Sequence, residues 1–76
     1  MKDVLETIIT TLVSKPENIS INQIDGEQSV VFEIKVADDD MGKVIGKQGA
    51  IAKSIRTIMK AVAAKENKRV TIEFID

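Results

Sequence analysis

The sequence contains no cysteine, histidine, tryptophan or tyrosine. Without cysteine it can form neither a disulfide framework nor a thiolate metal site, and without histidine it lacks the commonest metal ligand and general base. Carboxylates and lysines remain, but no pair of them is spaced to act as acid and base. We therefore expect a protein that is not an enzyme and that uses no cofactor and no metal.

Long hydrophobic runs are also missing. No apolar run exceeds four residues, and Asp3 stands where a signal peptide would be apolar. We expect no membrane-spanning segment and a cytoplasmic location. The 76 residues, 43% of them hydrophobic, suffice for one core, so residues 1–76 are predicted to form a single domain.

The net charge is only −1, but the charges are unevenly distributed. Residues 1–41 carry three basic and nine acidic side chains, a net charge of −6, whereas residues 42–69 carry eight basic side chains and one acid, a net charge of +7. Glu73 and Asp76 make the last seven residues acidic again. Such a basic block creates a local positive field that attracts anions, although a solvated helix face explains the same block.

Hydrophobic spacing predicts six elements in the order helix, strand, strand, helix, helix, strand. The predicted helices are Lys2–Lys15, ended by Pro16, then Met41–Ile45 and Ala50–Lys65. The predicted strands are Ile19–Ile24, Val30–Val36 and Val70–Ile75, with a tight hairpin turn at Asp25-Gly26 between the first two. The inward stripe of the last helix is predicted to be Ile51, Ile55, Ile58, Met59 and Val62.

This order predicts an α+β fold with a three-stranded mixed sheet. The hairpin makes the first two strands antiparallel, and the two-helix crossover favours a parallel third strand. Three helices would pack on one face of the sheet, over Val30, Phe32 and Ile34. Val31 and Ile75 would then lie on the opposite face.

Three carboxylates, Asp38-Asp39-Asp40, directly precede the short helix. We interpret them as an N-cap and as acids in the first turn, where the helix dipole favours negative charge. A divalent metal site is the weaker alternative, because hard cations usually need ligands from several elements.

Three of the four glycines fall between Met41 and Ile51, and Gly46-Lys47-Gln48-Gly49 interrupts the predicted helices. Glycine at both ends permits a sharp turn and a close approach of another backbone. The spacing matches neither G-x-G-x-x-G nor G-x-x-x-x-G-K-[ST], and the loop follows a helix rather than a strand, which disfavours a nucleotide site.

A G-x-x-G loop between two helices in this strand order resembles a type II KH domain over the whole chain. The segment from Asp40 to Arg56 is a more specific signal than a lone G-x-x-G motif. Together with Ala63–Val70, it resembles the sequences of the bacterial KhpA family of stand-alone RNA-binding proteins. The resemblance implies an RNA chaperone or post-transcriptional regulator, linked to cell-wall growth and cell length. It also implies a larger partner of the KhpB (Jag/EloR) type.

KH domains clamp about four nucleotides of single-stranded RNA through the G-x-x-G loop. The residues that the resemblance assigns to RNA binding are Gly42, Lys43, Ile45, Gly46, Lys47, Gln48, Gly49, Ala50, Lys53 and Arg56. The amides that open the helix after the loop are expected to face phosphates. Bases would rest on an aliphatic groove, with Val44, Ile45, Ile51 and either Ile34 or Val36 as candidates.

Two alternatives stay open from the sequence. The position after the second glycine is often basic or polar in the family but is Ala50 here, and the total charge is acidic. These features fit a protein-interaction or homodimerisation module with weak RNA affinity. DNA binding through a helix-turn-helix is disfavoured, because the tip is a short G-x-x-G loop and the second helix has few residues suited to base edges.

Overall fold

The computed structural model describes residues 1–75, so Asp76, one of the acids counted above, lies outside the described residues. The helices are α1 (Lys2–Leu12), α2 (Met41–Ile45) and α3 (Ala50–Lys65), and the strands are β1 (Ser20–Asp25), β2 (Ser29–Lys35) and β3 (Arg69–Phe74). Short 3-10 turns lie at η1 (Pro16–Asn18), η2 (Asp38–Asp40) and η3 (Lys47–Gly49). The predicted α+β order is confirmed.

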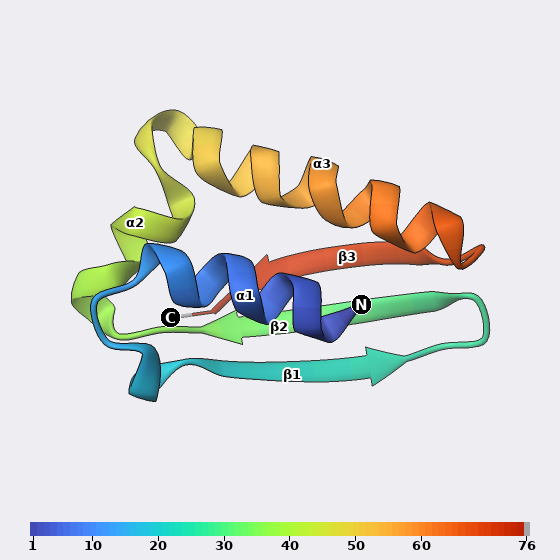
Figure 1. Cartoon of the computed structure of the whole chain (residues 1–76), viewed down its shortest axis with the longest axis horizontal. Coiled ribbons are helices and arrows are strands. Elements are labelled where there is room, and N and C mark those ends of the chain that lie inside the picture. Colours follow the sequence, from blue (N-terminus) through green and yellow to red (C-terminus); the bar gives the residue numbers. More distant parts are fainter. Residues whose placement is uncertain (76) are drawn as a thin grey trace.

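The three strands form one mixed sheet in the order β1-β2-β3 (Figure 1). β1 pairs with β2 antiparallel, and β2 pairs with β3 parallel after the crossover through α2 and α3. Phe32, in the middle strand, stands opposite Gln23 on one side and Ile72 on the other. This topology is the type II KH arrangement that the resemblance implies.

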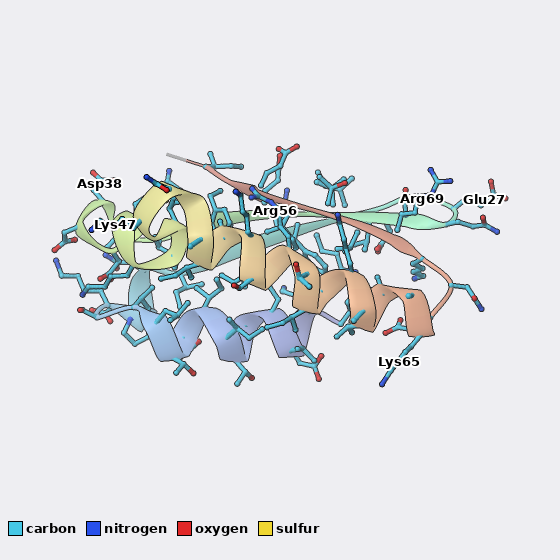
Figure 2. The ribbon with its side chains drawn as sticks, turned by 90° about the horizontal axis from the view of Figure 1, so that it is seen from above. Glu27, Asp38, Lys47, Arg56, Lys65 and Arg69 are labelled. Atoms are coloured by element: carbon cyan, nitrogen blue, oxygen red, sulfur yellow. The ribbon has the colours of Figure 1, made fainter. Side chains whose placement is uncertain are left out.

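All three helices cover the same face of the sheet, and Figure 2 shows α1 and α3 together on one side of it. β2 alternates as predicted, because Val30, Phe32 and Ile34 are buried against the helices. The other large buried side chains of this core are Leu5, Ile9, Val36, Val44, Ile55, Met59 and Ile72. Val31 lies on the open face, opposite Ile24 and Thr71, and Ile75 is 38% exposed.

The first helix ends at Leu12, three residues before the predicted boundary at Lys15. Lys15 precedes Pro16, and the proline ring disfavours the helical conformation for that residue, which has φ −121° and ψ 74°. The NH groups of Ser14 and Lys15 then donate to the carboxylate of Asp40 instead of to carbonyls of α1. Pro16 and a carboxylate distant in sequence therefore both contribute to the end of the helix.

The turn between β1 and β2 is wider than predicted. Asp25 is still part of β1, and residues 26–28 make the connection, closed by a hydrogen bond from the Gly26 NH to the Ser29 carbonyl (2.8 Å). A two-residue hairpin of the expected kind needs positive φ angles in its centre. Within residues 1–75 the glycines with positive φ are Gly46 and Gly49, not Gly26.

The boundaries of α3 are as predicted, but the prediction that Ile58 is buried is wrong, since its side chain is 46% exposed. The stripe facing the core is Ala52, Ile55, Met59 and Ala63. Ile58 directly precedes Met59, and successive helical residues point about 100° apart. With Met59 directed at the core, Ile58 therefore lies on the flank of α3.

Candidate nucleic-acid interface

The G-x-x-G loop is a tight connection built on two positive φ angles at its glycines. α2 ends at Gly46, whose NH donates to the Gly42 carbonyl (2.9 Å) and whose φ and ψ are 76° and 176°. Gly49 has φ 76° and ψ 14°, and its NH donates to the Gly46 carbonyl (3.2 Å). Gln48 between them is also left-handed, with φ 55° and ψ 27°. The loop is thus internally braced.

The two glycines are required for different reasons. A Cβ on Gly46 would lie 2.6 Å from Ile51 Cγ1 and 2.9 Å from the Ile51 nitrogen, so the backbone approaches Ile51 too closely for any side chain. A Cβ on Gly49 would meet nothing within 4 Å, and only the positive φ favours glycine there. Gly46 therefore fixes the loop on α3, and Gly49 leaves space open beside the tip.

Lys47 and Gln48 form the exposed tip of the loop. They are the first two residues of the η3 turn, so their NH groups have no carbonyl partner within that turn. The Ala50 NH, by contrast, donates to the Lys47 carbonyl and is used inside the loop. One amide at the start of α3 is therefore occupied inside the loop, whereas the amides of Lys47 and Gln48 have no partner within their turn.

A buried carboxylate lies at the other end of α2. Asp40 is 1% exposed and accepts hydrogen bonds from the NH groups of Ser14 (3.1 Å) and Lys15 (2.9 Å). Lys43 Nζ lies 3.1 Å from Asp40 Oδ1 and also donates to Ser14 Oγ. These donors, the Ser14 NH first, hold the pKa of Asp40 below its ordinary value.

The acidic triplet acts only in part as predicted. All three aspartates lie in the first turn of η2, as expected, and Asp40 occupies the N-cap position of α2. Its side chain makes no capping hydrogen bond, so that part of the interpretation is wrong. The carboxylate of Asp40 points instead to the end of α1, and Asp39 pairs with Lys15 at 3.1 Å. No group of three or more acidic side chains in residues 1–75 is placed to hold a metal ion.

Comparison with known proteins decides the family. The sequence model described as "KhpA/KhpB, KH domain" matches residues 2–74. The chain belongs to the KhpA/KhpB KH-domain family. It is 59% identical over 75 residues to "RNA-binding protein KhpA" of Clostridium acetobutylicum, covering 99% of this chain and 100% of the relative. Proteins of the same name from Clostridium perfringens and Borreliella burgdorferi are 56% identical (99% and 100% covered) and 43% identical (97% and 90% covered).

The basic side chains assigned to the interface of this KH domain fall into two groups. Lys47, at the tip, and Lys53, on the outer face of α3, are exposed, and neither forms an ion pair within residues 1–75. Lys43 is paired with Asp40, as described above. Arg56 is turned toward β3, so the structure does not bring all four cations to one point (Figure 2).

Arg56 joins α3 to the outer edge of β3. Its Nε and Nη2 atoms both donate to the Ile72 carbonyl at 3.3 Å, and its guanidinium carbon lies 5.7 Å from the centre of the Phe74 ring. The Ile75 NH donates to the Ile34 carbonyl of β2, and the Arg69 NH donates to the Gln28 carbonyl just before β2. Alternate residues of a parallel strand face the same neighbour, so the polar groups of Ile72 face away from β2. Residue spacing does not reveal this edge, because it does not show the order of the strands.

The aliphatic groove proposed for bases is smaller than predicted. Val44 and Ile34 are 0% exposed and Val36 is 4% exposed, so these three side chains belong to the core and cannot reach a base. Ile45 and Ile51 are half-buried, on either side of the loop. Among the named candidates, only these two present apolar surface next to Lys47 and Gln48.

Proposed function

We propose that this KH domain is a non-enzymatic module that binds the sugar-phosphate backbone of single-stranded RNA through Gly46–Gly49. The supporting observation is the exposed tip, where the main-chain NH groups of Lys47 and Gln48 lack partners in their turn beside a Lys47 ammonium that forms no ion pair within residues 1–75. Phosphate oxygens accept hydrogen bonds from such amides and are attracted by the lysine. The relatives from the two Clostridium species are named as RNA-binding proteins, which agrees with an RNA ligand.

The open space at Gly49 supports this assignment. Since no atom lies within 4 Å of the position where a Cβ would stand, an RNA backbone can approach the main chain there. Ile45 and Ile51 would contact the bases, which fits recognition without stacking on tryptophan or tyrosine. Lys53, one helical turn along α3 from the loop, would contact a neighbouring phosphate.

The test exchanges both tip side chains for aspartate. Lys47→Asp/Gln48→Asp should abolish binding of a short fluorescent single-stranded RNA while leaving the thermal unfolding midpoint nearly unchanged, because both residues are exposed. A matched control is Lys65→Asp/Asn67→Asp, which changes the net charge equally. This control lies at the far end of the 16-residue α3, about 24 Å away.

Retention of RNA affinity in the tip variant would remove the loop from the mechanism. Equal loss in both variants would mean that overall charge, rather than the loop, determines binding. A salt titration adds an independent measurement, because two lysine–phosphate contacts, from Lys47 and Lys53, imply a log–log slope of about −1.4 for single strands. A slope near zero would contradict the electrostatic part of the proposal.

We further propose that the domain acts in the cytoplasm as an RNA chaperone or post-transcriptional regulator, in line with the family resemblance. No helix in residues 1–75 is long and apolar enough to cross a bilayer. Acceleration of annealing between two complementary RNA strands, lost in the tip variant, would support the chaperone activity. The link to cell-wall growth and cell length stays a prediction from the resemblance.

A second candidate function is binding of a protein partner, either another copy or a KhpB-type protein. It is favoured by the two most exposed large apolar side chains among the described residues, Ile58 on α3 (46%) and Ile24 on the open sheet face (48%). Sedimentation velocity of the wild type against Ile58→Asp and Ile24→Asp distinguishes the two surfaces. A monomeric wild type that also fails to bind a KhpB-type protein would rule out this function.

A further inference from the structure

Asp40 connects two segments that are distant in sequence. Its Oδ1 atom accepts from the Ser14 NH and lies 3.1 Å from Lys43 Nζ, and its Oδ2 atom accepts from the Lys15 NH. The two NH donors lie 25 and 26 residues before Asp40 in the chain. One carboxylate thus joins the segment after α1 to the start of α2.

Burial makes this connection specific. A carboxylate that is 1% exposed needs hydrogen-bond and charge partners, since an unpaired buried charge is strongly unfavourable. The donors can take that role only because α1 has already ended and Lys15 precedes Pro16. A shift of α2 away from α1 would leave the charge without its partners, so the carboxylate restricts where α2 can lie.

The position of α2 in turn determines the position of the loop. α2 has only five residues, a length of about 8 Å, and its last hydrogen bond, from Gly46 NH to Gly42 carbonyl, leads directly into the loop. Val44 is the side chain of this helix that is buried in the core. Asp40 at the start and Val44 near the end are thus two attachments of α2, and the partly buried Met41 and Ile45 pack against the same core.

We propose that Asp40 is a positioning residue for the RNA-binding loop. Its carboxylate holds α2 against the end of α1 and keeps the Lys43 ammonium out of the phosphate contacts. This inference rests on the proposed function. It assigns Lys43, one of the residues that the resemblance links to RNA, to the bridge between Asp40 and Ser14. Lys47, at the tip, then supplies the cation that the phosphates meet first.

Lysine substitutions test the assignment of charge. Lys43→Met should leave the salt slope of RNA binding unchanged, because its ammonium already has an acidic partner. Lys47→Met should lower the magnitude of that slope by about 0.7, the value for one phosphate contact with a single strand. A slope reduced by Lys43→Met as much as by Lys47→Met would overturn the assignment of Lys43.

Aspartate substitution tests the positioning role. Asp40→Asn/Lys43→Met removes the carboxylate without releasing an unpaired ammonium, and it should bind RNA about fivefold or more weakly than Lys43→Met alone. Two-dimensional NMR of the folded protein should show shifted amide signals for Lys47 and Gln48 only in the variant that lacks the carboxylate. Equal affinity and unchanged loop signals in the two variants would overturn the inference.

Two controls keep the outcomes separate. If the double variant does not fold, Asp40→Glu takes its place, because it retains the charge but displaces both oxygens by one methylene. This variant should lose the same affinity for RNA, with an unchanged salt slope. A wild type that binds no RNA, or that binds equally well after Lys47→Asp/Gln48→Asp, refutes the proposed function itself. RNA binding through the tip with no effect at position 40 refutes only the positioning role.

Discussion

The glycines around the loop should respond very differently to alanine. At Gly46 the φ of 76° with ψ of 176° lies in a region that is essentially restricted to glycine, where another residue costs about 1–3 kcal/mol. The new Cβ would also stand 2.6–2.9 Å from atoms of Ile51, including its backbone nitrogen, and overpacking of this kind costs a further 1–3 kcal/mol or so. Gly46→Ala should therefore lower the free energy of unfolding by about 2–6 kcal/mol, the sum of the two costs.

Two matched substitutions separate these contributions. Gly49→Ala meets open space and should cost only about 1–2 kcal/mol for its left-handed conformation. Gly42→Ala, inside α2 and also without neighbours, should stabilise by roughly 0.5–1 kcal/mol, because alanine loses less backbone entropy on folding. Urea denaturation followed by circular dichroism measures all three. A Gly46→Ala variant no less stable than Gly49→Ala would refute the close approach to Ile51.

Three further predictions concern single residues. Gln48→Gly should raise the free energy of unfolding, measured by urea denaturation, by about 0.5 kcal/mol, because glycine adopts the left-handed conformation of this position without strain. Any destabilisation would contradict the φ of 55° at Gln48. Ile55→Ala should lower the free energy of unfolding by about 2–5 kcal/mol but Ile58→Ala by only about 1 kcal/mol, because the two side chains are 2% and 46% exposed. Equal losses would contradict the observed orientation of α3. Hydrogen bonds lower the pKa of the Asp40 carboxyl, so the ionised carboxylate stabilises the fold above the unfolded value of 3.8, and this contribution is lost as the pH falls through the folded pKa. The difference in unfolding free energy between the wild type and Asp40→Asn should therefore narrow below pH 3.8. An unchanged difference would contradict the bond to the Ser14 NH.

Local patterns were sufficient for most of the fold. The strict alternation in β2 and the glycine that ends α2 are properties of neighbouring residues, and the boundaries Ala50 and Lys65 of α3 were predicted correctly. The end of α1 was not predicted correctly, because Pro16 is only one of its two causes. The other cause is Asp40, which contacts the main chain from a distant position that no local pattern reveals.

The candidate site was less predictable than the fold. Spacing shows that Ile34, Val36 and Val44 are apolar but not whether they face a groove or the core, and the structure buries all three. Charge likewise predicts that Lys43 and Arg56 attract anions, but their actual partners are Asp40 and the Ile72 carbonyl. Tertiary packing decides which of several plausible surfaces a side chain reaches.

The bond from Arg56 to Ile72 has a consequence for how the sheet can be extended. Edge strands offer unpaired carbonyl and NH groups to strands of other chains, a common route to aggregation. On β3 the guanidinium occupies one of these acceptors and covers the Phe74 ring beside it. A foreign strand must displace this arginine before it can pair with β3. On the opposite edge of the sheet, along β1, no side chain in residues 1–75 donates to a main-chain carbonyl of the strand.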